Sequence, residues 1–102
     1  MLMTNAAIAQ NCNFRLSGHV EDEDVKDKLT AAVVTIMETG DQRITDARGD
    51  FLFENLCAGT YTVQITHVSC DTLIKKISVS KDVHYDFYLP HSRKVLGEVV
   101  LQ

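Results

Sequence analysis

The sequence predicts an all-β fold, a seven-stranded antiparallel sandwich of two sheets. Short apolar segments with alternating side chains recur at intervals of about ten residues, with turn residues between them. No stretch of the 102 residues shows the period of an amphipathic helix. A chain of this length buries roughly 65% of its unfolded surface. We therefore expect a single domain that folds without a metal or a cofactor.

The central segment of the chain is residues 45–66, TDARGDFLFENLCAGTYTVQIT. A tight turn at 46–50 leads into a short apolar strand at 51–53, and a second turn ends at Gly59. In the strand after this turn, Tyr61, Val63 and Ile65 alternate with polar residues, which places one set of side chains in a core and the other in water. We expect these two strands to form a β-hairpin with one buried face.

The other five strands are expected on both sides of this segment. A charged stretch without periodicity, residues 21–28, separates the first two, and Pro90 ends the last by removing a ladder donor. The predicted strands are 14–20, 29–37 with Ala32, Val34 and Ile36 inward, 43–45, 73–80 with Ile77 and Val79 inward, and 83–89 with Val83, Tyr85, Phe87 and Leu89 on its apolar face.

Charge and hydropathy exclude two classes of partner. Ten Lys and Arg are scattered among fourteen acids, with a net charge of −4, so there is no basic footprint for nucleic acid. No apolar run reaches the roughly 18 to 20 residues of a membrane helix, so we expect no membrane insertion. The four acids at 21–24 could attract a cation, but without a glycine-bearing ligand loop a solvated turn is favoured.

The first residues resemble the end of an export signal. Ala7-Ile8-Ala9 has the small-x-small pattern that precedes a signal-peptide cut, although the basic region and a full apolar region are missing. We interpret residues 1–13 as a signal-peptide remnant or a disordered start. The alternative is an apolar tail with no targeting role.

The three cysteines can be sorted by strand geometry. Cys57 and Cys70 flank one extended strand, and thirteen residues at about 3.3 Å each separate them too far for a disulfide. If strands alternate in direction, the first and fifth run the same way, so Cys12 and Cys57 lie at the same end of the sandwich. We favour a Cys12–Cys57 disulfide in an oxidising compartment, with three free thiols as the alternative. Cys70 is then left over as a structural residue.

The polar residues do not form a recognisable catalytic or metal site. His19, His67, His84 and His91 are dispersed without metal-ligand spacing. His67 and His84 could meet across strands, but exposed strand histidines are favoured. No Ser or Cys has an evident His and acid partner, and Arg48-Gly49-Asp50, which spells an integrin-type tripeptide, fits a turn better. We predict no catalytic, cofactor-binding or metal-binding residues and no enzymatic activity.

Four blocks of sequence resemble the carboxypeptidase-regulatory-like domain. The resemblance covers about residues 14–89 and implies a transthyretin-like (prealbumin-like) sandwich with an Ig-like Greek key. It is specific for the fold and much less so for function, because this module is attached to many different proteins. The blocks are Leu16-x-Gly18-x-Val20-x-Asp22, Leu29 to Ile36, Thr45-Asp46-Ala47-x-Gly49-x-Phe51-x-Phe53, and Gly59 to Val63.

The chain beyond Pro90 resembles a second feature of one receptor class. After the polar linker 91–94, the segment Val95-Leu96-Gly97-Glu98-Val99-Val100-Leu101 is similar to the Leu-Asp-Glu-Val-Val-Val segment that comes after this domain in TonB-dependent outer-membrane receptors of the Bacteroidetes type. There it precedes the plug and includes the TonB box. The resemblance implies a sandwich at 14–90, a linker and TonB-box-like segment at 91–102, and partner-binding residues at 95–101. Gly97 departs from the acid that is usual at its position.

The resemblance implies a function without catalysis. We expect a periplasmic accessory domain of a TonB-dependent receptor for nutrient uptake, on the periplasmic face of the outer membrane, with TonB and the parent receptor's plug and barrel as partners. The alternative is a stand-alone or cell-surface binding or adhesion module of the same fold. Hydroxyisourate hydrolases share the fold but require a Tyr-Arg-Gly-Ser type ending, and this chain ends Val99-Val100-Leu101-Gln102.

Overall fold

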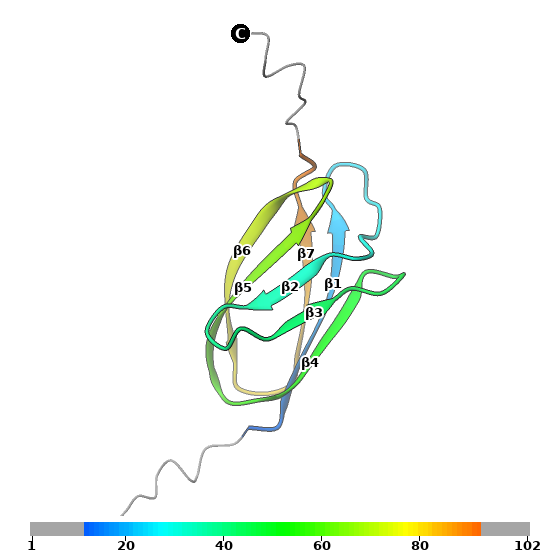
Figure 1. The fold of residues 1–102 in the computed structure, drawn as a ribbon. Helices are drawn as coiled ribbons and strands as arrows, with labels where there is room; N and C mark the ends of the chain where they lie inside the picture. The colour runs from blue at the N-terminus through cyan, green and yellow to red at the C-terminus, as the bar shows by residue number, and fades with distance from the viewer. Residues whose placement is uncertain (1–11, 93–102) are drawn as a thin grey trace, which may run out of the picture.

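The described part of the chain is a two-sheet sandwich. The computed structural model describes residues 12–92, and within them it contains seven strands and no helix that could span a membrane. A three-stranded sheet of order β4-β1-β7 packs against a four-stranded sheet of order β3-β2-β5-β6 (Figure 1). This confirms the predicted all-β sandwich of seven strands. The strands are β1 (Phe14–Asp22), β2 (Val33–Ile36), β3 (Gln42–Ile44), β4 (Asp50–Leu56), β5 (Gly59–His67), β6 (Cys70–Val79) and β7 (Val83–Leu89).

One pairing departs from the antiparallel plan. β1 pairs with β7 in parallel, from Leu16 opposite Val83 to Asp22 opposite Leu89. Strand direction alternates along the chain, so the first and seventh strands run the same way and can pair only in parallel. Parallel neighbours need a long crossover connection. Here the other five strands provide it.

The predicted hairpin of the central segment is wrong. β4 pairs with β1, whereas β5 pairs with β2 and β6, so the two strands lie in different sheets. Residues Cys57 and Ala58 carry the chain from one sheet to the other. The alternation of apolar side chains was read correctly, because Phe53 and Val63 are both buried. Alternation defines the face of a strand that enters the core, but not the strand that pairs along its edge.

The predicted strand at 29–37 is shorter in the structure because its first residues cross between the sheets. The backbone N–H of Leu29 donates to Val20 of β1 at 3.0 Å, and Ala31 has a left-handed φ of 63°. The Thr45 hydroxyl accepts from the N–H of Ala32 at 2.9 Å and donates to the carbonyl of Leu29 at 2.6 Å. This buried threonine therefore holds the crossing segment, and β2 begins only at Val33. The predicted inward residues Ala32, Val34 and Ile36 are buried.

Aromatic rings fill the centre of the core. The Phe51 ring lies 5.8 Å from that of Phe53 and 6.1 Å from that of Phe87, between centroids. The Arg43 guanidinium lies 4.7 Å from the centroid of Phe53 and donates to the carbonyl of Leu52 at 3.0 Å. Arg43 thus covers the core where edge strands β3 and β4 of the two sheets meet.

Gly18 of β1 makes room for one of these rings. A Cβ at this position would lie 2.3 Å from Cζ of Phe51 and 3.0 Å from the carbonyl oxygen of Tyr85. Because Phe51 is itself buried against other rings, it cannot move aside freely. The absence of a side chain at Gly18 is what lets the Phe51 ring lie against the central strand β1.

We expect Gly18→Ala to lower the free energy of unfolding by roughly 1–3 kcal/mol, the usual cost of overpacking a core. Urea denaturation of the wild type, Gly18→Ala, Phe51→Leu and the double variant measures this. Shortening Phe51 relieves the clash, so the double variant should lose less stability than the two single variants together. Gly40→Ala is the comparison for backbone strain without a clash, because its φ is 81° and its Cβ would meet nothing within 4 Å. Strictly additive losses would contradict the proposed clash.

Candidate functional site

Of the two sites predicted from the sequence, the structure describes the disulfide but not the binding segment. Residues 95–101 lie outside the described residues, as does most of the predicted signal remnant at 1–13. Cys12 and Cys57 form a disulfide with an S–S distance of 1.97 Å, so the alternative of three free thiols is wrong. Cys12 precedes β1 and Cys57 lies in the β4–β5 connection, at the same end of the sandwich, as the strand directions predict. Cys70 is free and buried.

The four histidines lie in separate surroundings, and the suggested meeting of His67 and His84 does not occur. His67 ends β5 in the four-stranded sheet, where its Nδ1 accepts from the backbone N–H of Ser69 at 3.1 Å. His84 lies on β7 in the other sheet. His19 shares the outer face of that sheet with His84, since the two alternate in the same sense on paired strands.

His19 lies between two carboxylates. Its Nδ1 is 2.8 Å from Oδ1 of Asp50, and its Nε2 is 2.9 Å from Oε2 of Glu21. Only a protonated imidazole donates from both nitrogens. The hydrogen bond with Asp50, supported by that with Glu21, raises the pKa of His19 above its usual 6.5, although partial burial opposes the shift.

A row of Ser, His and Asp side chains crosses the same outer face. Ser17 Oγ lies 2.9 Å from Nδ1 of His84, and Nε2 of His84 lies 3.0 Å from Oδ1 of Asp86. The sequence shows no evident His and acid partner for a Ser, whereas the folded chain brings these three side chains together. However, the His84 and Asp86 side chains are 57% and 50% exposed. Catalytic electrostatics depend on a site from which water is excluded, so we interpret this row as surface hydrogen bonding.

A buried cluster forms where three distant parts of the chain meet. Asp22 ends β1, Cys70 begins β6 and His91 comes after β7. Asp22 is only 2% exposed, so the expectation that residues 21–28 form a solvated turn is wrong at this position. Its Oδ1 accepts from the backbone N–H groups of Asp24 and Val25 at 2.8 and 3.1 Å. Its Oδ2 lies 3.5 Å from Sγ of Cys70 and 2.7 Å from Nδ1 of His91.

Backbone pairing holds two members of this cluster side by side. Cys70 and His91 are opposed in an antiparallel bridge. The flanking bonds run from the N–H of Asp71 to the carbonyl of Pro90 at 2.8 Å and from the N–H of Ser92 to the carbonyl of Ser69 at 3.0 Å. This pattern defines a non-hydrogen-bonded pair, whose side chains share one face and lie closest together. Both side chains are thus directed to Asp22.

The cluster combines an ionised acid with a neutral thiol. The hydrogen bond with His91 lowers the pKa of Asp22 to about 2, and the N–H groups of Val25 and Asp24 act in the same direction against burial. Burial raises the pKa of the Cys70 thiol. A protonated thiol is a poor nucleophile, and its hydrogen-bond partners are the Asp22 carboxylate and the Ser69 hydroxyl rather than His91. The arrangement does not activate Cys70 for covalent catalysis.

The same three residues are the metal-ligand candidates of the described chain. Within residues 12–92, Asp22, Cys70 and His91 are the one group of acidic, Cys and His side chains whose ligand atoms all lie within 4.8 Å of one another. Sequence spacing does not reveal this group, because 48 residues separate Asp22 from Cys70 and 69 separate it from His91. The alternation of β1 gave one indication that Asp22 is buried. Positions 16, 18 and 20 face inward, and Asp22 is the next residue in that row.

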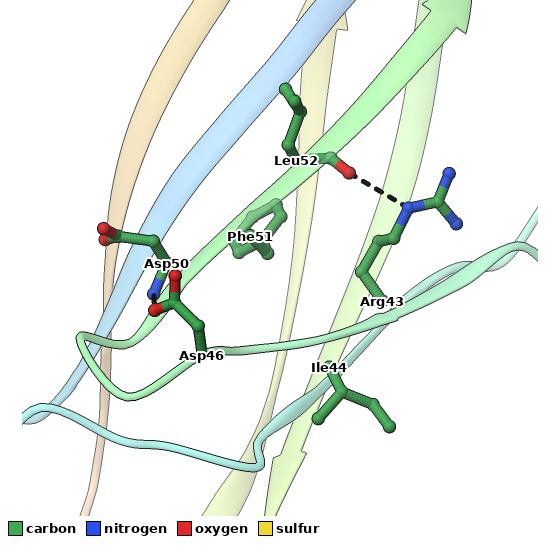
Figure 2. Close-up of a pocket in the computed structure, with 6 residues that line it drawn as sticks. All are labelled: Arg43, Ile44, Asp46, Asp50, Phe51 and Leu52. Carbon is green, nitrogen blue, oxygen red and sulfur yellow. Dashed lines mark hydrogen bonds between the residues drawn. The ribbon is translucent and has the colours of Figure 1, made fainter.

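An open pocket lies beside the edge strands β3 and β4. It has a volume of about 300 Å³, and Figure 2 shows its lining residues. Ile44 and Leu52 are 68% and 41% exposed there. Oδ1 of Asp46 accepts from the N–H groups of Arg48 and Asp50, which confirms that the Arg48-Gly49-Asp50 tripeptide forms a turn. The pocket is lined by Arg43, Ile44, Asp46, Asp50, Phe51 and Leu52.

The chain belongs to the CarboxypepD_reg-like domain family, whose model matches residues 16–101. The match confirms the resemblance of the four sequence blocks at the level of the domain. A comparison with curated protein sequences gives no match.

Solved structures with the same fold come from protein complexes and from a Bacteroides protein. Two are interface mutants of the type II cohesin–X-dockerin complex of Acetivibrio cellulolyticus. The first is 30% identical over 72% of this chain and 52% of that chain, with a TM-score of 0.62. The second is 26% identical over 82% and 62%, with a TM-score of 0.67. None of the names, including that of the third structure, describes an enzyme.

The third structure is a candidate carbohydrate-binding protein from Bacteroides uniformis. It is 19% identical over 74% of this chain and 40% of that chain, with a TM-score of 0.57. At this identity it supports the fold alone. The present chain spans between 40% and 62% of the length of the three solved chains that it matches.

We expect replacement of both Cys12 and Cys57 by Ser to lower the free energy of unfolding by about 4 kcal/mol, because the disulfide closes a loop of 45 residues. Guanidinium denaturation under non-reducing conditions measures the loss. Adding a reductant to the wild type should cause a similar loss and should leave the double variant unchanged. Equal stability of the wild type with and without reductant would show that the bond contributes nothing.

The raised pKa of His19 predicts a pH-dependent stability. The stabilisation by His19 is complete below the unfolded pKa of about 6.5. It is lost as pH rises through the higher folded pKa. Relative to His19→Gln, the wild type should therefore lose stability as pH rises above about 6.5, in thermal unfolding at a series of pH values. The control His84→Gln keeps the Asp50–His19–Glu21 contacts and should retain the decline, whereas an identical decline in His19→Gln would refute the role of His19.

Proposed function

We propose that this domain is a non-enzymatic periplasmic accessory domain of a TonB-dependent outer-membrane receptor for nutrient uptake. In this proposal, the sandwich is a rigid spacer, and residues 95–101 bind TonB by adding a strand to a partner sheet. Membership of the CarboxypepD_reg-like family and the similarity of residues 95–101 to the TonB-box region support it.

The observation that carries the proposal is the path of the chain through the sandwich. β1 and β7 run in parallel, so the chain enters at the end that holds Cys12 and reaches Ser92 at the opposite end (Figure 1). A domain crossed from end to end holds the segments on its two sides apart. The hydrogen bond from Ser92 to Ser69 and the Cys12–Cys57 disulfide anchor the two ends. Such a domain suits a spacer better than a side attachment.

The disulfide supports the proposed compartment. Structural disulfides persist in oxidising environments such as the bacterial periplasm and are rare in the cytosol. Cys12 and Cys57 are bonded, and the remaining thiol, Cys70, is buried. The cysteine arrangement therefore supports export of the domain.

The absence of catalysis is part of the proposal and has its own support. The Ser17, His84 and Asp86 row is solvated, and the Cys70 thiol has a raised pKa. Neither nucleophile is activated. Incubation with hydroxyisourate, the substrate of the transthyretin-like hydrolases, should give no turnover above the uncatalysed rate.

Val99→Pro should weaken binding to the TonB C-terminal domain by roughly tenfold, because proline removes one inter-strand donor and obstructs pairing. Calorimetric titration of the full chain with that domain measures the affinity. Val99→Thr is the matched control, because it changes the side chain, keeps the backbone donor and should bind nearly as the wild type does. Equal affinities of the proline and threonine variants would overturn strand addition.

The second candidate function is a stand-alone or cell-surface binding module of the same fold. The pocket beside β3 and β4 favours it, because Ile44 and Leu52 present apolar surface to solvent. The two cohesin–X-dockerin complexes show the same fold within structures that assemble through protein contacts. The genomic reading frame beyond Gln102 separates the two functions: several hundred codons of plug and barrel pattern support the receptor, and a stop codon supports the module.

A further inference from the structure

We propose that Asp22, Cys70 and His91 form a binding site for one zinc ion at the end of the sandwich where β7 terminates. This inference does not rest on the receptor function, because it uses only described residues. A carboxylate oxygen, a thiolate sulfur and an imidazole nitrogen are the three ligand types that zinc takes in proteins. Hard cations such as Ca²⁺ require six or more oxygen ligands and do not suit a cysteine.

The distances between the ligand atoms fit a tetrahedral ion. Zinc bonds of about 2.0–2.3 Å place neighbouring ligands about 3.3–3.8 Å apart. Oδ2 of Asp22 is already 3.5 Å from Sγ of Cys70, and the three ligand atoms lie within 4.8 Å of one another. The contact of 2.7 Å between Oδ2 and Nδ1 of His91 needs to open by about half an ångström. Rotation of the half-exposed imidazole is sufficient for that.

The backbone presents these ligands before any ion binds. Cys70 and His91 are opposed residues of one bridge, and the N–H groups of Asp24 and Val25 fix the Asp22 carboxylate through Oδ1. Oδ2 is thereby directed to the two other side chains. Hydrogen bonds to the carboxylate oxygen that does not bind the metal orient the ligand, and such bonds strengthen metal sites. Little ordering is required on binding.

Charge also balances in the proposed complex. The ion displaces one proton from the Cys70 thiol, which leaves to the buffer. The hydrogen that Nδ1 of His91 donates to Asp22 leaves Nδ1 through solvent, so that the imidazole binds as the neutral tautomer with its remaining hydrogen on Nε2 and the lone pair on Nδ1. The charges of the Asp22 carboxylate and the Cys70 thiolate then add to −2, which neutralises Zn²⁺. A site of zero net charge is the arrangement that a buried position favours, because an uncompensated ion would lose its hydration.

The surroundings leave an access path and a fourth position. Asp22 and Cys70 are 2% and 9% exposed, but the His91 side chain is 45% exposed. An ion can therefore approach from the His91 side, and a water molecule can complete the tetrahedron there. Three protein ligands and one open position are the pattern of an accessible zinc site rather than a closed structural one.

Cobalt substitution tests the site. Metal-free full chain is titrated with Co²⁺ under argon and then with Zn²⁺, and absorption is recorded. The wild type should develop a thiolate-to-cobalt charge-transfer band and the visible bands of tetrahedral Co²⁺, saturating at one ion per chain. Zn²⁺ should abolish both. Absence of the charge-transfer band at saturating Co²⁺ would overturn the proposal.

Variants separate this site from adventitious binding. Cys70→Ser should remove the charge-transfer band and weaken Zn²⁺ binding at least tenfold, and His91→Gln should weaken Zn²⁺ binding similarly. His84→Gln is the control, because His84 also contacts a carboxylate but lies on the open sheet face. Should Cys70→Ser fail to fold, the half-exposed His91→Gln carries the test through the rise in Tm caused by Zn²⁺. Unchanged affinity in His91→Gln would show binding by surface residues only and would refute the site.

Discussion

The parallel pairing of β1 with β7 organises the whole sandwich. It joins the first strand to the last. Between them the chain leaves the three-stranded sheet for β2 and β3, returns as β4, and leaves again for β5 and β6 before it ends in β7. It places Val20 beside Phe87 and Asp22 beside Leu89. The aromatic core lies on one side of this seam, and the polar cluster lies at its end. The pairing of β1 with β7 therefore determines the direction in which the chain crosses the sandwich. It also determines where the aromatic core and the polar cluster lie.

Gly18 and Asp22 show what the central position of β1 requires. Both belong to the inward row of that strand, where apolar side chains would be expected. Gly18 leaves room for the Phe51 ring, and Asp22 receives four hydrogen bonds that compensate for its burial. Two residues that weaken an isolated strand are thus explained by their partners in the folded sandwich.

Most strands could be predicted because alternation is a local property. β7 has the predicted bounds, and Ala32, Val34, Ile36, Ile77 and Val79 are buried as expected. The Cys12–Cys57 bond also came from local reasoning, since strand direction alone places both residues at one end. The prediction that β4 and β5 form a hairpin was wrong because strand pairing is not a local property. A turn of two residues can reverse the chain within a sheet or carry it to the opposite sheet, and both outcomes bury Phe53 and Val63.

The order of residues was enough to predict the fold class, the inward faces of the strands and the family resemblance, and to favour the cysteine pairing, because each depends on neighbours along the chain or on strand direction. The parallel seam, the sheet to which β4 belongs and the meeting of Asp22, Cys70 and His91 emerged only in the folded molecule. These features join residues up to 69 positions apart. No periodicity records such contacts, because they arise when the strand ends of two packed sheets come to lie at the same edge of the molecule.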